Sequence, residues 1–267
     1  MEKIGIVLTT IKRAEILKRC LESITNHWPE NIECEILIGD QNLLPYETEG
    51  IIHNFIDNYP HQSIYCQLLV YNCGISAARN ALVQVAYERN CSHVLLTADN
   101  IVFTESMTHI NKLSPLFDKY DVLGLNLLKR NTGWRGKLNL IPNQSFELDF
   151  LNVNNTLPNY DENGIKIWDV DIHHNFFLAK IGALLDNPWD DNLLMLEHED
   201  WAYNSKLNGI KKGWTDYCSG EYIRDKSDEA YNEIRRININ KSRQYLFKKW
   251  NIKTWITYKN LPERKPP

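Results

Sequence analysis

Residues 74–100 read GISAARNALVQVAYERNCSHVLLTADN, and this stretch indicates the fold class. A turn containing glycine precedes a helical pattern at 76–90, and an apolar run at 93–98 follows it directly. A helical period that gives way to a short apolar run is typical of an α/β unit whose strand is buried in a parallel sheet. The run ends at Asp99 and Asn100, where such a sheet presents polar groups to ligands.

The segments before this stretch repeat the same alternation. Apolar runs that predict strands stand at 4–9, 35–39 and 63–71, and helical patterns stand between them at 13–24 and 47–59. Alternating strand and helix patterns are typical of α/β proteins. We therefore expect a doubly wound, mostly parallel sheet that binds ligands at the carboxyl ends of its strands.

The second half is less regular. After about residue 121, turn residues separate shorter patterns. These predict a strand at 170–179, a helix at 198–207 and a long C-terminal helix at 228–249. Substrate-binding elaborations of the sheet are expected here.

The expected domain organisation follows this change of pattern. We expect a catalytic domain over residues 1–223, divided into a nucleotide-binding half (1–105) and an acceptor half (106–223), and then a tail over 224–267. The tail has twelve Lys or Arg and five acids, an excess of about +7.

Aromatic residues alternate with lysines in this tail, at Tyr245, Phe247, Trp250, Trp255 and Tyr258. This mixture suits peripheral contact with a membrane surface. The alternative is a helix whose aromatic side chains pack on the catalytic domain.

Composition narrows the function classes. The chain has 267 residues, a formal charge of -4 and a pI near 6.1, so it lacks the basic excess of nucleic-acid-binding proteins. Its six cysteines show no paired or zinc-site spacing, which favours reduced thiols and no structural zinc. No apolar run is long enough for a signal peptide or a membrane span. We expect a cytoplasmic protein, soluble or attached peripherally to the inner face of the membrane.

Three residues near the ends of the first two expected strands are candidate nucleotide-binding residues. Thr9 and Asp40 end these strands, and Arg13 begins the helix after the first. A carboxylate such as Asp40 can accept a hydrogen bond from a pyrimidine N–H or a ribose hydroxyl. The alternative is that Thr9 and Asp40 only end strands and cap turns.

The helix after Gly74 has a start that suits a phosphate-bearing ligand. Ser76 is expected as its N-cap, and the small Ala77 and Ala78 let a ligand approach the backbone. Arg79 can then reach a phosphate or an acidic neighbour. The alternative is an ordinary, tightly packed helix.

Residues 197–201 read EHEDW at the start of another expected helix. Acids in the first turn of a helix stabilise it by about 0.3–1 kcal/mol each, which is one interpretation of these residues. A carboxylate here could also accept a proton from a hydroxyl group.

Four short segments, taken in their order along the chain, resemble the catalytic half of an inverting GT-A glycosyltransferase of the family-2 type. They are Gly74–Asn80, Leu95–Asn100, Asn175–Ala179 and Glu197–Trp201. Over about residues 4–225 the motif pattern resembles that of β-1,4-N-acetylgalactosaminyltransferase-like enzymes. The resemblance implies a GT-A fold, a UDP-N-acetylhexosamine or UDP-galactose donor, and a glycan or glycolipid acceptor in polysaccharide biosynthesis.

The resemblance also implies roles for individual residues. Asp200 falls on the position of the catalytic base, with Glu199 as the next candidate. Trp189, Asp190 and His198 are expected to line the acceptor pocket, although Trp189 could equally be a core residue. The dipole of the helix is expected to favour the ionised form of Asp200.

The acidic motif that holds Mn²⁺ or Mg²⁺ in this family is reduced to Asp99, between Ala98 and Asn100, and no histidine follows His198. Arg224 and Lys226 fall near the place of the missing histidine, so one interpretation is that they neutralise the diphosphate without a metal. The other is that Asp99 still takes part in a weak metal site.

Two other functions stay open. A nucleotidyltransferase shares this kind of sheet but needs a Gly-rich loop after the first strand, and residues 9–13 contain no glycine. A non-catalytic nucleotide- or glycan-binding relative would explain the reduced acidic motif.

Overall fold

The first half of the chain forms a four-stranded parallel sheet. Its strands are β1 (Lys3–Thr10), β2 (Glu33–Asp40), β3 (Ser63–Leu68) and β4 (His93–Leu96), in the order β3-β2-β1-β4. The structure is a computed structural model that describes residues 1–44, 46–129, 135–161, 163–223, 229–254 and 256–259. The expected strands are present, although β3 ends three residues earlier than predicted.

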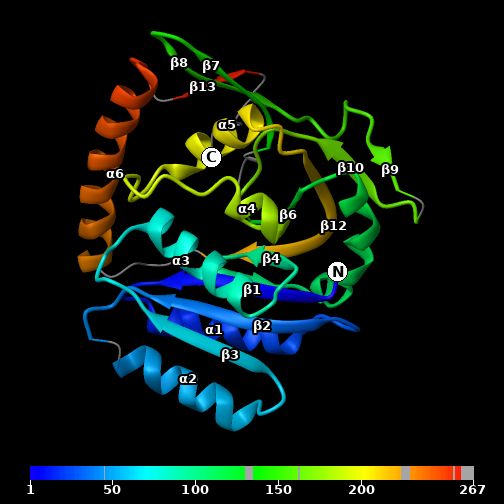
Figure 1. The fold of residues 1–267 in the computed structure, drawn as a ribbon, viewed down its shortest axis with the longest axis vertical. Coiled ribbons are helices and arrows are strands. Elements are labelled where there is room, and N and C mark those ends of the chain that lie inside the picture. Colours follow the sequence, from blue (N-terminus) through cyan, green and yellow to red (C-terminus); the bar gives the residue numbers. More distant parts are fainter. Residues whose placement is uncertain (45, 130–134, 162, 224–228, 255, 260–267) are drawn as a thin grey trace.

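Helices cover both faces of this sheet. Successive side chains of β1 point to opposite faces, so each face presents apolar side chains that a helix can cover. Ile4, Ile6 and Leu8 pack on the side of α1 (Ala14–Asn26) and α2 (Tyr46–Asn58). Val7 packs on the other side, against α3 (Ile75–Glu88). Figure 1 shows α1 and α3 on opposite sides of β1. This doubly wound arrangement confirms the fold class that the sequence predicts.

The second half extends the sheet through β4-β11-β6-β12-β10-β9. The added strands are β6 (Val122–Leu128), β9 (Asn159–Tyr160), β10 (Lys166–Asp169), β11 (Phe177–Lys180) and β12 (Lys212–Tyr222), and β5 (Ile101–Phe103) pairs with the end of β12. β11 is antiparallel to both of its neighbours, whereas β12 is parallel to β6. Three helices accompany them: η1 (Glu105–Asp118), α4 (Ile181–Leu185) and α5 (Glu197–Leu207).

The single strand predicted at 170–179 is wrong. β10 ends at Asp169 and pairs with β12, whereas β11 begins at Phe177 and pairs with β4 and β6. The two strands lie on opposite sides of the β6–β12 pair, so the chain between them must leave one position in the sheet and cross to the other. The local pattern of residues 170–179 could not reveal this break.

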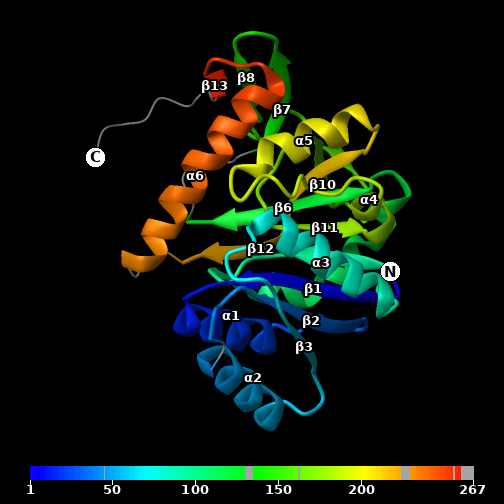
Figure 2. The same cartoon turned by 60° about the vertical axis from the view of Figure 1, so that its left-hand side comes forward.

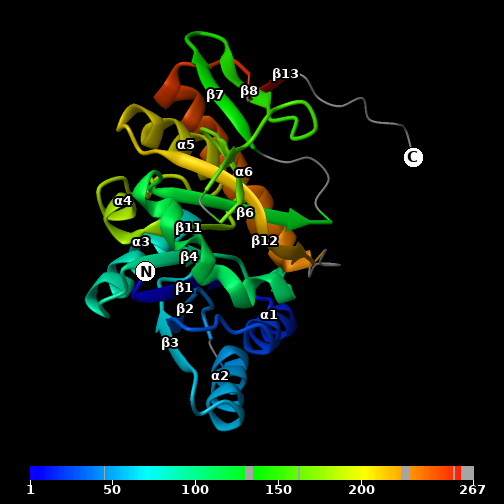
Figure 3. The same cartoon turned by 90° about the vertical axis from the view of Figure 1, so that its right-hand side faces the viewer.

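A second, smaller sheet was not predicted. It contains β7 (Gly136–Ile141), β8 (Ser145–Phe150) and β13 (Ile256–Lys259) in the order β13-β8-β7. Figure 3 shows it at the end of the molecule opposite α2. The long helix α6 (Glu229–Trp250) runs from the main sheet to this smaller one, as Figures 1 and 2 show.

The aromatic side chains of α6 pack on the rest of the protein. Tyr245, Phe247 and Trp250 lie against a core that includes Leu138, Phe146 and Leu246. This packing corresponds to the second alternative for the tail, in which the aromatic side chains of a helix pack on the catalytic domain. None of the helices in the described ranges is long and apolar enough to cross a membrane. Membrane contact through 224–267, and the division of the chain at residue 223, stay predictions.

Candidate functional site

The carboxyl ends of β1, β2 and β4 bring together several of the expected nucleotide-binding residues. Thr10 lies opposite Asp40 in the pairing of β1 with β2. Thr10 Oγ1 donates a hydrogen bond of 3.0 Å to Asp99 Oδ2, and the Arg13 guanidinium forms an ion pair with the same carboxylate. Asp99 is fully buried. The strand order therefore places residues 10, 13, 40 and 99 along one edge of the sheet.

A small cavity of about 80 Å³ lies at this edge. Thr9, Arg13, Gln41, Tyr231 and Arg235 are among the residues that line it. Tyr231 and Arg235 come from the first part of α6, and the Arg13 guanidinium lies 4.4 Å from the centre of the Tyr231 ring. Pockets for small ligands are usually about 300–1,000 Å³. This cavity is therefore smaller than a usual ligand pocket, and residues of α6 form part of its lining.

Asp40 stabilises a turn, and its nucleotide-binding role stays a prediction. Its Oδ1 accepts hydrogen bonds from the backbone N–H and the side-chain amide of Asn42, at 2.8 and 2.7 Å, and so stabilises a turn. Its buried Oδ2 has no hydrogen-bond partner among the described residues. A buried carboxylate oxygen without a partner is costly, so this atom is available to a ligand N–H or hydroxyl.

The start of α3 differs from the prediction. Gly74, and not Ser76, is the N-cap residue, with a φ of 92°. A Cβ at Gly74 would lie 2.8 Å from the Leu194 backbone, which also favours glycine. Ser76 is buried inside the helix and donates a 2.7 Å hydrogen bond to the Leu193 carbonyl. Its hydroxyl thus anchors α3 to the segment before α5.

Arg79 has an acidic neighbour in this structure. It is 3% exposed, and its guanidinium donates to Glu197 Oε1 at 2.5 Å. The same Glu197 oxygen accepts a 2.8 Å hydrogen bond from Asn175 Nδ2. Asn175 Oδ1 in turn lies 2.8 Å from His198 Nδ1. We call Arg79, Glu197, Asn175 and His198 the arginine–histidine network. The nucleotide-binding assignment of Arg79 stays a prediction.

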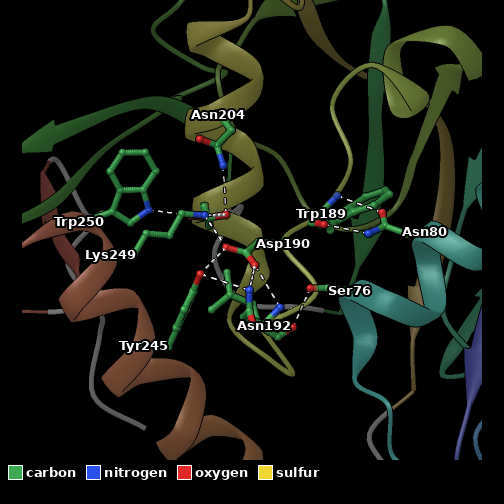
Figure 4. A network of polar contacts seen from close by, with 11 residues as sticks. Ser76, Asn80, Trp189, Asp190, Asn192, Asn204, Tyr245, Lys249 and Trp250 are labelled. Carbon is green, nitrogen blue, oxygen red and sulfur yellow. Dashed lines mark hydrogen bonds and ion pairs between the residues drawn. The ribbon is translucent and has the colours of Figure 1, made fainter. Parts of the chain in front are cut away.

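Asp200, the expected base, contacts two residues of α6; Figure 4 labels its partners Asn204, Lys249 and Trp250. Its Oδ1 accepts from Trp250 Nε1 at 2.6 Å and from Lys249 Nζ at 2.9 Å, and its Oδ2 accepts from Asn204 Nδ2 at 3.1 Å. Burial raises the pKa of Asp200, opposed by Lys249 and Trp250. Burial, and not the expected stabilisation of the ionised form by the helix dipole, therefore has the largest effect on the pKa of Asp200.

The neighbouring Asp190 belongs to the same contact with α6. It accepts hydrogen bonds from Lys249 Nζ at 2.7 Å and from the Tyr245 hydroxyl at 3.0 Å. We call Asp190, Asp200, Tyr245, Lys249 and Trp250 the α6 clamp. Sequence reasoning missed the α6 residues of this clamp, because no local pattern connects them with positions 190 and 200.

Trp189 and Glu199, two other residues expected near the acceptor or the base, are buried. Trp189 is 3% exposed, and its ring stacks on that of Trp201 with the centres 5.1 Å apart, which favours the core role left open for it. The pKa of Glu199 is raised to about 8, mainly by burial and in part by the nearby Glu197 and Asp200. The catalytic roles of Asp200 and Glu199 and the acceptor roles of Trp189, Asp190 and His198 stay predictions.

Asp99 is the one acid left in the reduced acidic motif, and its part in a metal site stays a prediction. In the part of the chain that the structure describes, no group of three or more His, Cys, Asp or Glu side chains could hold a metal ion. Thr10 gives Asp99 a hydroxyl partner and Arg13 gives it a guanidinium partner, whereas Mn²⁺ and Mg²⁺ bind several oxygen ligands. Asn100 is partly exposed beside Asp99. Arg224 and Lys226, the expected diphosphate ligands, lie outside the described residues.

Comparison with known proteins identifies the fold. No protein-family model and no curated protein sequence matches the chain. The crystal structure of S. aureus TarS 1-349 matches with a TM-score of 0.56 and 12% identity, over 90% of this chain and 65% of that one. A longer S. aureus TarS structure matches with a TM-score of 0.56 and 15% identity, over 88% of this chain and 39% of that one.

Ligand complexes of S. aureus TarS 1-349 match similarly. The complex with UDP-GlcNAc has a TM-score of 0.54 and 12% identity, over 90% of this chain and 66% of that one. The chain therefore spans about two thirds or less of the TarS chains that it matches. Similarity at such low identity shows the fold alone. The protein has the mostly parallel α/β GT-A fold that the sequence predicts.

Proposed function

We propose that the protein is an inverting glycosyltransferase that transfers a sugar from a UDP-sugar to a hydroxyl group of a glycan or glycolipid. The observation that carries the proposal is the meeting of Thr10, Arg13, Asp40 and Asp99 at the carboxyl edge of a GT-A sheet. TarS, which has the same fold, was crystallised with UDP and with UDP-GlcNAc. The motif pattern supports an N-acetylhexosamine or galactose donor.

Residues at the sheet edge have chemistry suited to each part of the donor. Asp40 Oδ2 can accept from the uracil N–H or a ribose hydroxyl. Arg13 lines the cavity and has the planar guanidinium that suits phosphate oxygens. Arg224 and Lys226 are proposed, from the sequence, to add positive charge at the diphosphate. A contribution from Mn²⁺ or Mg²⁺ is a separate question for experiment.

The proposed reaction is a single displacement. The acceptor oxygen forms a bond to the sugar C1 from the face opposite the diphosphate. The bond between C1 and the diphosphate oxygen breaks, and UDP leaves with its electron pair. A protein base takes the hydroxyl proton, a role that the sequence assigns to Asp200 or Glu199.

The first test is a thermal-shift series with UDP, GDP, CDP and UDP-GlcNAc, each with Mn²⁺ and with EDTA. Ligand at about 100 times its Kd stabilises a protein by about 2.7 kcal/mol. We expect a shift with UDP and not with GDP or CDP, and UDP release from UDP-GlcNAc, UDP-GalNAc or UDP-galactose. The absence of both effects would refute the proposal.

A non-catalytic nucleotide-binding protein is the second candidate. The small cavity under α6 and the enclosed Asp200 favour it. This candidate predicts a UDP-specific thermal shift without UDP release from any UDP-sugar, including when sugar acceptors are added.

A further inference from the structure

We propose that two loops at the carboxyl edge of the sheet, together with the exposed face of α6, form a surface that binds an anionic lipid membrane. The loops are residues 41–44, after β2, and residues 68–73, at and after the end of β3. We call them the edge loops. This surface differs from the one expected from the sequence, where the aromatic residues of the tail contact the membrane. Tyr245, Phe247 and Trp250 pack on the core instead.

The edge loops expose a group of large apolar side chains. These are Leu43, Leu44, Leu68, Val70 and Tyr71. Leu43 is 71% exposed and Val70 is 77% exposed. Neither loop contains a charged residue. Large apolar side chains that gather at a protein surface mark contact with a protein, a ligand or a membrane.

The two edge loops lie side by side. The parallel pairing of β2 with β3 places Leu68 opposite Asp40, and the Leu69 N–H donates to the Asp40 carbonyl at 2.7 Å. The Asn72 N–H donates to the Gln41 carbonyl at 3.4 Å. In Figure 1 both loops lie at the left, on the same side as the first turns of α6. Their exposed side chains therefore belong to one surface.

The helix α6 joins this surface. Asn238 Nδ2 donates a 2.7 Å hydrogen bond to Asn72 Oδ1, which attaches α6 to the second edge loop. Ile237, next to this contact, is 43% exposed and adds another apolar side chain. Lys241 and Arg243 follow on the same helix and are both exposed. Cations thus lie beside the apolar loops.

The charge of this part of the molecule is positive although the chain as a whole is acidic. Residues 235–253 contain seven Lys or Arg and no Asp or Glu, whereas the formal charge of the chain is -4. A further cation lies on the other side of the loops. The Lys12 N–H donates to Asn42 Oδ1 at 2.7 Å, and the residue is exposed. An anionic surface would therefore be attracted to this side of the protein.

Apolar side chains beside cations fit an anionic membrane better than they fit a second copy of this chain. In a symmetric dimer through this surface, each copy would present the same cations to the other, and like charges repel. An anionic lipid surface instead attracts each nearby Lys or Arg, by about fivefold in the binding constant. The apolar side chains add to the binding when they leave water at the lipid boundary.

Membrane binding through the edge loops would also orient the candidate site. The first loop directly follows Asp40, a proposed ligand of the donor. The donor edge of the sheet would then lie near the lipid headgroups, where a glycolipid acceptor is found. Lipid binding does not itself require sugar transfer, so it can be tested separately from the proposed function.

The test is flotation of the full chain with vesicles. One set contains phosphatidylcholine alone, and the other contains phosphatidylcholine mixed with an equal amount of phosphatidylglycerol. We expect binding to the mixed vesicles alone, and weaker binding as the salt concentration rises. The double variant Leu43→Asn, Leu44→Asn should lower this binding by about tenfold or more. The double variant Lys241→Glu, Arg243→Glu should lower it by a similar factor of about ten or more.

Matched controls change residues of the same kind elsewhere. Leu157→Asn replaces an apolar side chain that is 94% exposed but lies outside the edge loops. The double variant Lys112→Glu, Lys166→Glu makes the same change in net charge at exposed positions of η1 and β10. Both controls should bind the mixed vesicles as the wild type does. All the changed residues are exposed, so thermal unfolding should show a folded protein in every case.

Two results would overturn the proposal. One is a wild-type protein that does not bind the mixed vesicles, and the other is an equal loss of binding in the test and control variants. Sedimentation would also reveal a dimer that Leu43→Asn, Leu44→Asn abolishes. Such a dimer without vesicle binding would show that the surface binds a second copy instead. Absence of UDP release would refute the proposed function but would leave vesicle binding unaffected.

Discussion

Lys249, in the last turn of α6, forms an ion pair of 2.9 Å with Asp200, in the first turn of α5. The same ammonium group contacts Asp190 at 2.7 Å. One lysine near the C-terminus thus connects two acids of the acceptor half. The α6 clamp adds polar contacts to the apolar packing of Tyr245, Phe247 and Trp250, and both hold α6 in place.

Replacing Lys249 tests the strength of the clamp. Lys249→Met leaves the buried Asp200 carboxylate without its cation, and removing one partner of a buried pair can cost about 3–5 kcal/mol. Because the lysine side chain is 25% exposed, we expect a smaller loss, of about 1–3 kcal/mol. Urea unfolding measures this loss. Lys248→Met, an exposed neighbour, should change the stability by less than about 0.5 kcal/mol. Equal losses in the two variants would show that the ion pair contributes nothing.

Arg235 is expected to contribute to donor binding. It lines the cavity at the sheet edge, whereas the next residue, Arg236, forms an exposed ion pair with Glu233. A hydrogen bond to a charged group is worth about 1.5–3 kcal/mol. Arg235→Ala should therefore weaken UDP binding by roughly tenfold or more in calorimetric titrations, and Arg236→Ala should not. The same affinity in both variants would remove Arg235 from the donor site.

Glu35 should make the fold sensitive to acid. Burial opposes its ionisation, but hydrogen bonds from Arg89, Ser63 and Lys3 outweigh burial and lower the pKa of Glu35 to about 2. A lowered pKa in the folded state stabilises the protein above the unfolded value, near 4.5, and this stability is lost as the pH falls towards 2. The loss should be about 3 kcal/mol. In Glu35→Gln we expect lower stability at pH 7 and a flatter dependence on pH between 4.5 and 2, measured by urea unfolding.

Glu199 should have the opposite effect on how the stability of the fold depends on pH. Its pKa is raised to about 8 by burial, so the folded state binds a proton that the unfolded state releases near pH 4.5. The free energy of unfolding should therefore fall as the pH rises from 4.5 to 8. Glu199→Gln removes this proton dependence and should stabilise the protein by about 2–4 kcal/mol at pH 8. A destabilised Glu199→Gln at that pH would contradict the burial of an uncompensated carboxyl group.

The elements of the first half could be predicted because their signals are local. The predicted helix at 13–24 has Leu17, Cys20, Leu21 and Ile24 buried on one face of α1. The predictions failed where contacts with residues distant in the sequence determine the local structure. Ser76 looked like an N-cap, but the approach of Leu194 to Gly74 sets the start of α3. The stretch 170–179 looked like one strand, but β10, which pairs with β12, ends at Asp169, and only residues 177–179 of the stretch pair with β4.

The sequence by itself determined the α/β class, the order of the strands along the chain and the polar residues that end them, because side-chain periodicity and turn residues act over a few positions. Only the tertiary structure decided which of these polar groups meet. Lys249 and Trp250 reach Asp200 across about fifty residues, and Asn175 joins Glu197 to His198. The long-range packing of the sheet and α6 thus determines which residues each side chain of Glu197–Asp200 contacts. These four adjacent residues therefore lie in four different environments.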